Sequence, residues 1–501
     1  MLNLMFNSFL GNSPRWFKYS IIGFLIFNIF SFYILGPVIT AWIFIAEFIF
    51  TLAMALKCYP LQSGGLLAIQ ALALGLTTPE NSYHEIDANL EVILLLMFMV
   101  AGIYFMKPLL MYIFSKVFTK VKSKMVLSFL FVFLSAILSA FLDALTVTAV
   151  LISVAAGFYG VYHKIHSSSS DYDESGTLDR TQLSGETLIQ FQSFLRSLIM
   201  HGLVGTALGG VCTLVGEPQN LLIGEKLGWD FIEFFVRMSH VTIPVLFAGL
   251  LTTLLLEYTG WFGYGAKLPE VARVIIQSYT DEMDKNRNQR QKYDLWVQGV
   301  AAVLLIIGLA LHLAPVGLIG LALIIIQTAF MGITEEHSLG KAFEEALPFT
   351  GLLVVFFVIV AMIHDQHLFK PVIEYAFSLS EAQQPQFFYI ASGLLSMISD
   401  NVFVATVFIG EVYEALKDFV DPSSPNFDAG KRELYNNLAV AINTGTNLPS
   451  VATPNRQAAF LFLLTSTLAP LIHLSYMKML KMAIPYTIVL GILGYIGNVF
   501  F

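Results

Sequence analysis

Apolar runs long enough to cross a membrane as helices, about 18 residues or more, recur along the whole chain. Of its 501 residues, 56% are hydrophobic and 12% are charged. A soluble domain has about 25% charged residues. The first run has no small-residue cleavage site before the next one begins, so we interpret it as a first span and not as a signal peptide. The pattern predicts an all-α polytopic membrane protein.

Several classes of function lack their motifs. The two cysteines, Cys58 and Cys212, are far apart and indicate neither a disulfide framework nor a metal site. Neither GxxxxGK[ST] nor G-x-S-x-G is present, which argues against an ATP-driven pump and a hydrolase. We therefore expect no enzyme activity, no cofactor and no nucleic-acid partner. An ion gradient would then drive any transport.

Lysine and arginine positions predict how the spans are oriented. We expect spans at 20–36, 38–56, 61–77, 89–106, 125–162, 191–226, 235–257, 296–312, 314–333, 348–364, 387–412, 433–474 and 478–500. Basic residues before the first span, around 107–124 and at 285–292 fall on one side if 125–162 returns to the face it came from. By the positive-inside rule that side is the cytoplasm, with the N-terminus. Arg196, Arg237 and Glu257 are expected at span ends, and the Ser-rich stretch 167–187 as a flexible loop.

One acidic side chain interrupts the apolar stretch FLSAILSAFLDALTVTAVLISVAAG, which runs from Phe133 to Gly157. A charged side chain at the centre of a membrane span costs about 2.5–3.5 kcal/mol on insertion scales. The segment 125–162 is also too long for one helix and too short for two full spans. An intramembrane acid of this kind indicates a functional site, so Asp143 is a candidate ion carrier.

The sequence contains an internal repeat of three blocks in the same order. FMKPLLMYIFSKV from Phe105 matches LFKPVIEYAFSLS from Leu368. LSAFLDALTVTAV, with Asp143, matches LSMISDNVFVATV, with Asp400. LGGVCTLVGEPQNLLIG matches INTGTNLPSVATPNRQA in the spacing of glycine and proline. The sequence therefore predicts a duplicated unit.

Five expected spans separate the two Lys-Pro blocks, and an odd number means that the second copy is inverted. Inverted repeats with interrupted helices are typical of secondary transporters, which bind substrate where the repeats meet. We expect four regions. N-terminal, mainly scaffold spans occupy 1–106, and a first repeat at 107–257 contains a hairpin at 125–162 and a broken helix at 191–226. A cytoplasmic loop and scaffold spans follow at 258–364, and a second repeat at 365–501 contains a hairpin at 387–412, a broken helix at 433–474 and the last span.

The interrupted segments supply oxygen atoms, which hard cations prefer as ligands. Glycine and proline permit unwound backbone, and its carbonyl groups are tolerated in a membrane where they line a cavity. The candidate ion-binding residues are Asp143, Thr146, Thr148, Gly209 and Thr213 in the first repeat and Asp400, Asn401, Asn443, Thr444, Thr446 and Asn447 in the second. Each threonine could instead bond its own backbone. Glu217 and Arg456 could form a structural ion pair or act as charges near the site.

A carboxylate that holds either a proton or Na+, but not both, exchanges the two ions by competition. Asp143 and Asp400 are therefore expected to bind Na+ and H+ in turn. This is the physical minimum of a cation/proton antiporter.

These motifs resemble those of the ion-transporter superfamily, which includes divalent-anion/sodium symporters and arsenite permeases. The hairpin tips read Leu142-Asp143-Ala144 and Ser399-Asp400-Asn401 where the symporters have Ser-Asn-Thr. Over essentially the full chain the pattern is similar to NhaB-type sodium/proton antiporters. The resemblance implies a bacterial inner-membrane protein that expels Na+, with Li+ as an alternative cation, in electrogenic exchange for protons. It also implies a transport domain with both hairpins and a scaffold domain that forms homodimers in the lipid bilayer.

Two other functions compete with antiport. A sodium-coupled anion symporter would share the architecture, but two added acids repel an anionic substrate. An intramembrane aspartyl protease also needs two membrane aspartates, but its Gly-x-Gly-Asp context is absent at both positions. The sequence favours the antiporter.

Overall fold

The computed structural model describes residues 2–168, 185–344, 346–453 and 458–500, and every regular element within them is a helix. The prediction of an all-α fold is confirmed. Most of the predicted loop at 167–187, and Arg456, lie outside the described residues.

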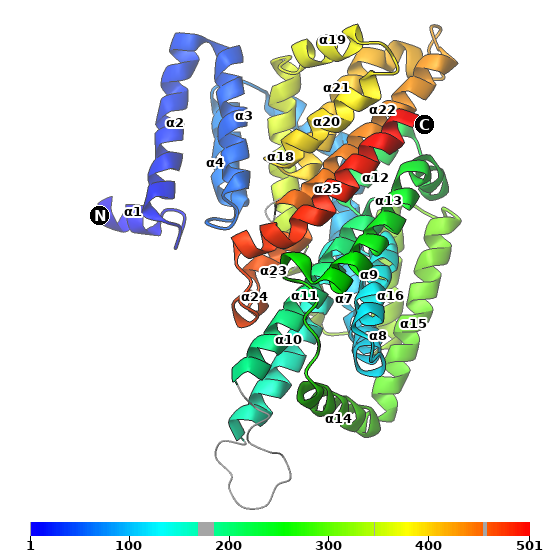
Figure 1. Cartoon of the computed structure of the whole chain (residues 1–501). Helices are drawn as coiled ribbons and strands as arrows, with labels where there is room; N and C mark the ends of the chain where they lie inside the picture. The colour runs from blue at the N-terminus through cyan, green and yellow to red at the C-terminus, as the bar shows by residue number, and fades with distance from the viewer. Residues whose placement is uncertain (1, 169–184, 345, 454–457, 501) are drawn as a thin grey trace, which may run out of the picture.

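The N-terminal helices form a separate group beside the rest of the molecule (Figure 1). They are α1 (Leu2–Ser8), α2 (Arg15–Leu35), α3 (Pro37–Ala53) and α4 (Pro60–Ala73). Gly36, with φ of 84°, makes the sharp turn from α2 into α3. The buried Asn28 of α2 donates to Glu47 of α3 at 2.7 Å and to Gln70 of α4 at 3.1 Å. These bonds tie the three helices together.

The next span is bent. It consists of α5 (Pro79–Ala88), α6 (Leu90–Leu94), a π-helical turn at Leu95–Met99 and α7 (Val100–Tyr104). The bend between Pro79–Ala88 and Leu90–Tyr104 is 65°. Helix α8 (Lys107–Lys120) follows and carries the first Lys-Pro block.

The first half of the predicted repeat contains two interruptions. Helix α9 (Lys124–Phe141) ends just before Asp143, and α10 (Ala144–Ser168) begins directly after it. Helix α11 (Gly185–Gly210) is separated from α12 (Pro218–Leu227) by the stretch around Gly216, and α13 (Phe231–Thr259) follows.

Helices of the central region connect the two halves. They are a 3₁₀ turn at Trp261–Gly263, α14 (Glu270–Asn286), α15 (Gln289–Ala310), α16 (Val316–Phe330), α17 (Glu336–Glu344) and α18 (Leu347–Asp365). Helix α14 is amphipathic and joins α8 through an ion pair between Lys116 and Asp284.

The second half repeats the order of the first. It contains α19 (Lys370–Ser378), α20 (Gln384–Ser396), α21 (Asn401–Val420), α22 (Ala429–Asn447), a 3₁₀ turn at Pro449–Ala452, α23 (Ala458–Thr465), α24 (Leu468–Leu471) and α25 (Tyr476–Phe500). Asp400 lies between α20 and α21, as Asp143 lies between α9 and α10. Helix α9 packs on α11, and its counterpart α20 packs on α22.

Seven described helices are long and apolar enough to cross a membrane, and the bent α5–α7 segment would be an eighth. They are Arg15–Leu35, Lys124–Phe141, Ala144–His163, Phe231–Thr259, Gln289–Ala310, Leu347–Asp365 and Tyr476–Phe500. The polytopic architecture is thus present. The segment 125–162 was expected to be too short for two full spans, but by length and composition each of its arms, Lys124–Phe141 and Ala144–His163, is long enough for one. Two long side chains expected to reach the polar boundary at span ends are buried within the protein: Arg196 is 5% exposed, and Glu257, in the last turn of α13, is 7% exposed. Each is buried because it has polar partners: the Arg196 guanidinium donates to the Ile472 carbonyl at 2.7 Å, and the Glu257 carboxylate lies 2.7 Å from the His201 ring.

Candidate ion-binding site

Both interrupting aspartates cap the helices that follow them. The Asp143 carboxylate accepts a hydrogen bond from the Thr146 backbone N–H at 3.1 Å, at the start of α10. The Asp400 carboxylate accepts one from the Val402 N–H at 2.8 Å, at the start of α21. The positive end of a helix stabilises a negative charge at this position. The two halves therefore hold their acids in the same local structure.

The two aspartates, 257 positions apart in sequence, line one small cavity. Its volume is about 30 Å³, enough for one water-sized particle. The wall is formed by the N-termini of α10 and α21, the start of α12, and single residues of α18 and α23. The lining residues are Asp143, Ala144, Leu145, Glu217, Pro218, Gln219, Phe349, Asp400, Asn401, Val402 and Ala459. Residues from both halves thus meet at one point.

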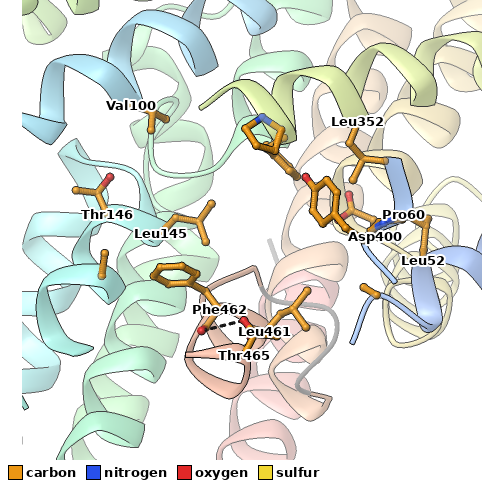
Figure 2. Close-up of a pocket in the computed structure, with 15 residues that line it drawn as sticks. Leu52, Pro60, Val100, Leu145, Thr146, Leu352, Asp400, Leu461, Phe462 and Thr465 are labelled. Carbon is orange, nitrogen blue, oxygen red and sulfur yellow. Dashed lines mark hydrogen bonds between the residues drawn. The ribbon is translucent and has the colours of Figure 1, made fainter. Parts of the chain in front are cut away.

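Asp400 also lines a second, larger cavity of about 430 Å³, which Figure 2 shows with Thr146 and Leu145 opposite. Its wall is mostly apolar and draws on α3, α10, α18 and α23. Two of its lining residues, Tyr59 and Phe462, are 39% and 42% exposed, so the cavity reaches the surface. Leu145, Phe349 and Asp400 line both cavities. The two cavities thus share part of their walls.

The other candidates of the first half lie around the cavity but not in it. Thr148 is buried on α10, outside the residues that line either cavity. The Thr213 hydroxyl donates to the Ala140 carbonyl, which ties the α11–α12 connection to the end of α9. Gly209 lies so close to α9 that a Cβ there would overlap the Ala136 carbonyl. Thr213 and Gly209 therefore have structural contacts in this conformation, and their role as ligands stays a prediction.

Of the candidates in the second half, one lines the small cavity and two bond to their own helix. Asn401 lines the small cavity, and its amide donates to the Ser450 hydroxyl at 3.2 Å. The hydroxyls of Thr444 and Thr446 donate to carbonyls of their own helix, those of Val440 and Asn443, at 2.7 and 2.9 Å.

Two asparagines of α22 contact the first half. The Asn443 amide lies 3.7 Å from the Met238 sulfur of α13. The Asn447 carbonyl oxygen accepts from Gln219 at 2.8 Å. This last bond joins the two broken helices directly.

Two polar residues of the cavity wall, Glu217 and Gln219, were not among the predicted ligands. Both lie in the quoted run LVGEPQN, between the break of α11 and the start of α12. Asn220, beside them, donates to the carbonyls of Gly210 and Thr213, both at 2.7 Å, and holds the unwound backbone in place. In the sequence, the signal for Glu217 and Gln219 was a cluster of polar residues beside a predicted helix break.

The chain was compared with known proteins. Residues 1–500 match the family described as Bacterial Na+/H+ antiporter B (NhaB). A protein named Na(+)/H(+) antiporter NhaB from Saccharophagus degradans is 60% identical over 504 aligned positions, which cover 100% of this chain and 98% of that protein. One of the same name from Marinomonas sp. is 58% identical over 493 positions, covering 97% of this chain and 96% of the relative. The chain therefore belongs to the NhaB family of bacterial Na+/H+ antiporters.

Proposed function

We propose that this Na+/H+ antiporter exchanges its two ions at one site shared by both halves, with Asp143 and Asp400 as the groups that hold either Na+ or a proton. The observation that carries the proposal is that both carboxylates line the same cavity of about 30 Å³. Deprotonated, they attract a cation, and protonated, they release it. One site that cannot hold both ions couples their opposite movements.

The size and charge of the cavity favour a small cation over an organic anion. A space for about one water-sized particle is too small for a dicarboxylate. The carboxylates in its wall would also repel an anion. With the family assignment, this supports Na+/H+ exchange and not the sodium-coupled symport that the sequence had left open.

Helix arrangement supports an inverted repeat with two re-entrant hairpins. In Figure 1, α8, α10 and α14 lie at the lower end of the molecule, whereas α19, α20 and α21 lie at the upper end. The α9–α10 and α20–α21 pairs would then reach the membrane centre from opposite faces, and their aspartates would meet there. By the positive-inside rule the lower end is cytoplasmic, and we place the chain in the inner membrane with a cytoplasmic N-terminus.

Other expectations from the resemblance belong to the same proposal. Exchange would be electrogenic if more than one proton is bound for each Na+. Li+ as an alternative cation and a homodimer formed through the scaffold stay predictions.

The test is to replace each aspartate by asparagine, because asparagine caps a helix as well as aspartate does but holds no exchangeable charge. In everted membrane vesicles we expect Asp143→Asn and Asp400→Asn each to abolish the collapse of the pH gradient that Na+ causes. The matched control is Asp230→Asn, because Asp230 also caps a helix, accepting from the Glu233 N–H at 2.7 Å, and lies outside both cavities. Full exchange in both site variants would refute the proposal.

A further inference from the structure

We propose that Glu217 and Gln219 supply two further oxygen ligands to the transported cation, the Glu217 carboxylate and the Gln219 side-chain carbonyl. This inference rests on the proposed shared site and extends it. Both residues lie at the N-terminal end of α12 and line the small cavity with Asp143, Asp400 and Asn401. The site would thus draw on the broken helix of the first half as well as on the hairpin tips.

Hydrogen bonds determine which way the Gln219 amide points. A backbone carbonyl only accepts, so the Asn447 amide nitrogen must be the atom that faces the Asn443 carbonyl, at 2.9 Å. The Asn447 carbonyl oxygen then faces Gln219 and accepts from its amide nitrogen at 2.8 Å. The same nitrogen donates to the Glu217 carboxylate at 3.1 Å. The Gln219 nitrogen is thereby used twice, and its carbonyl oxygen is left for another partner.

Three oxygen atoms of the cavity wall have no hydrogen-bond donor among the described residues. They are one Glu217 carboxylate oxygen, the Gln219 side-chain oxygen and the Asn401 side-chain oxygen. All three atoms are inaccessible to solvent, and Gln219 and Asn401 are 0% and 3% exposed. A buried acceptor without a donor costs about 1–3 kcal/mol. A cation coordinated by such an oxygen would take the place of the missing donor.

The charge around the cavity also calls for a cation. The Glu217 carboxylate lines the same cavity as the carboxylates of Asp143 and Asp400. Carboxylate and amide oxygens are the ligands that a hard cation prefers.

The test measures Na+ binding directly, by the rise in thermal stability that Na+ causes in the purified full-length protein in detergent. We expect Glu217→Gln and Gln219→Met each to raise the Na+ concentration for half-maximal stabilisation by about tenfold or more. The matched control is Glu225→Gln, because Glu225 lies on the same helix, is exposed and lines neither cavity. Its half-maximal concentration should match that of the unchanged protein. The half-saturating Na+ concentration of each variant is also measured from Na+-driven exchange in everted vesicles.

The outcomes separate this inference from the proposed function. Unchanged Na+ dependence in Glu217→Gln and Gln219→Met, with Asp143→Asn and Asp400→Asn inactive, would overturn the inference and leave the shared site standing. If Glu217→Gln does not fold, Gln219→Met, which keeps the length of the side chain, decides alone. Full exchange in both aspartate variants would overturn the shared site itself.

Discussion

Glu257 is an acid that the fold holds away from the candidate ion site. One of its carboxylate oxygens lies 3.1 Å from the Lys124 ammonium group and 2.7 Å from the His201 ring, and it also accepts from the hydroxyls of Ser128 and Ser197, at 3.1 and 2.7 Å. The Glu257 side chain is fully buried. Lys124 and Ser128 lie at the start of α9, and Ser197 and His201 lie in the middle of α11. The cluster therefore fixes both helices to the end of α13.

Removing one member of this cluster should destabilise the protein more than removing two. Glu257→Gln leaves the Lys124 charge buried without its counter-charge, and we expect a loss of about 3–5 kcal/mol in the free energy of unfolding. The double variant Lys124→Met with Glu257→Gln removes both charges and should lose less. Thermal unfolding of the purified variants measures this. A double variant that is less stable than Glu257→Gln alone would contradict it.

The residues of the candidate site differ in how readily the sequence alone predicts them. Asp143 stands out because a lone acid interrupts an apolar run, and Asp400 stands out because it recurs at the matching place of the repeat. Glu217 was expected only as part of an ion pair or as a charge near the site, and Gln219 was not singled out, since a polar residue beside a helix break has many local uses. Their place became apparent only through the bond between Gln219 and Asn447, which lie 228 positions apart.

Among the helices, the interruptions at the candidate site were predictable because the residues that cause them are local. Aspartate caps a new helix at Asp143 and Asp400, and Pro218 begins α12 at its first turn. The π-helical turn at Leu95–Met99 was not predictable. Its sequence, LLMFM, is uniformly apolar and continues the run on both sides, so it carries no mark of the changed backbone.

The two hairpins should be accessible from opposite sides of the membrane. Lys122, before α9, and Ser380, before α20, are both exposed. In a chain whose native Cys58 and Cys212 are replaced by serine, we expect Ser380→Cys to react with an impermeant maleimide in intact spheroplasts. Lys122→Cys should react only in everted vesicles. Labelling of both positions from the same side would rule out the inverted arrangement.

At the scale of the whole molecule, the fold brings acids of two distant segments to one small cavity, and a larger cavity shares part of its wall. The duplication and its inversion are predictions that rest on matched blocks and the number of spans between them. The larger cavity could not be inferred, because its wall combines the N-terminal helices with α10, α18 and α23. Which helices lie side by side across hundreds of residues depends on packing, and apolar runs of similar composition do not specify it.

Competition between Na+ and protons tests the central claim most directly. The initial rate of Na+-driven exchange is measured in everted vesicles over a series of Na+ concentrations at several pH values. If the two ions bind the same carboxylates, each step of one pH unit toward acid, in the range where these groups take up protons, should raise the half-saturating Na+ concentration by about tenfold for one competing proton and by about a hundredfold for two, and high Na+ should restore the rate. A half-saturating concentration that stays constant while the maximal rate falls would show that the ions bind at separate sites, and would contradict a shared site at Asp143 and Asp400.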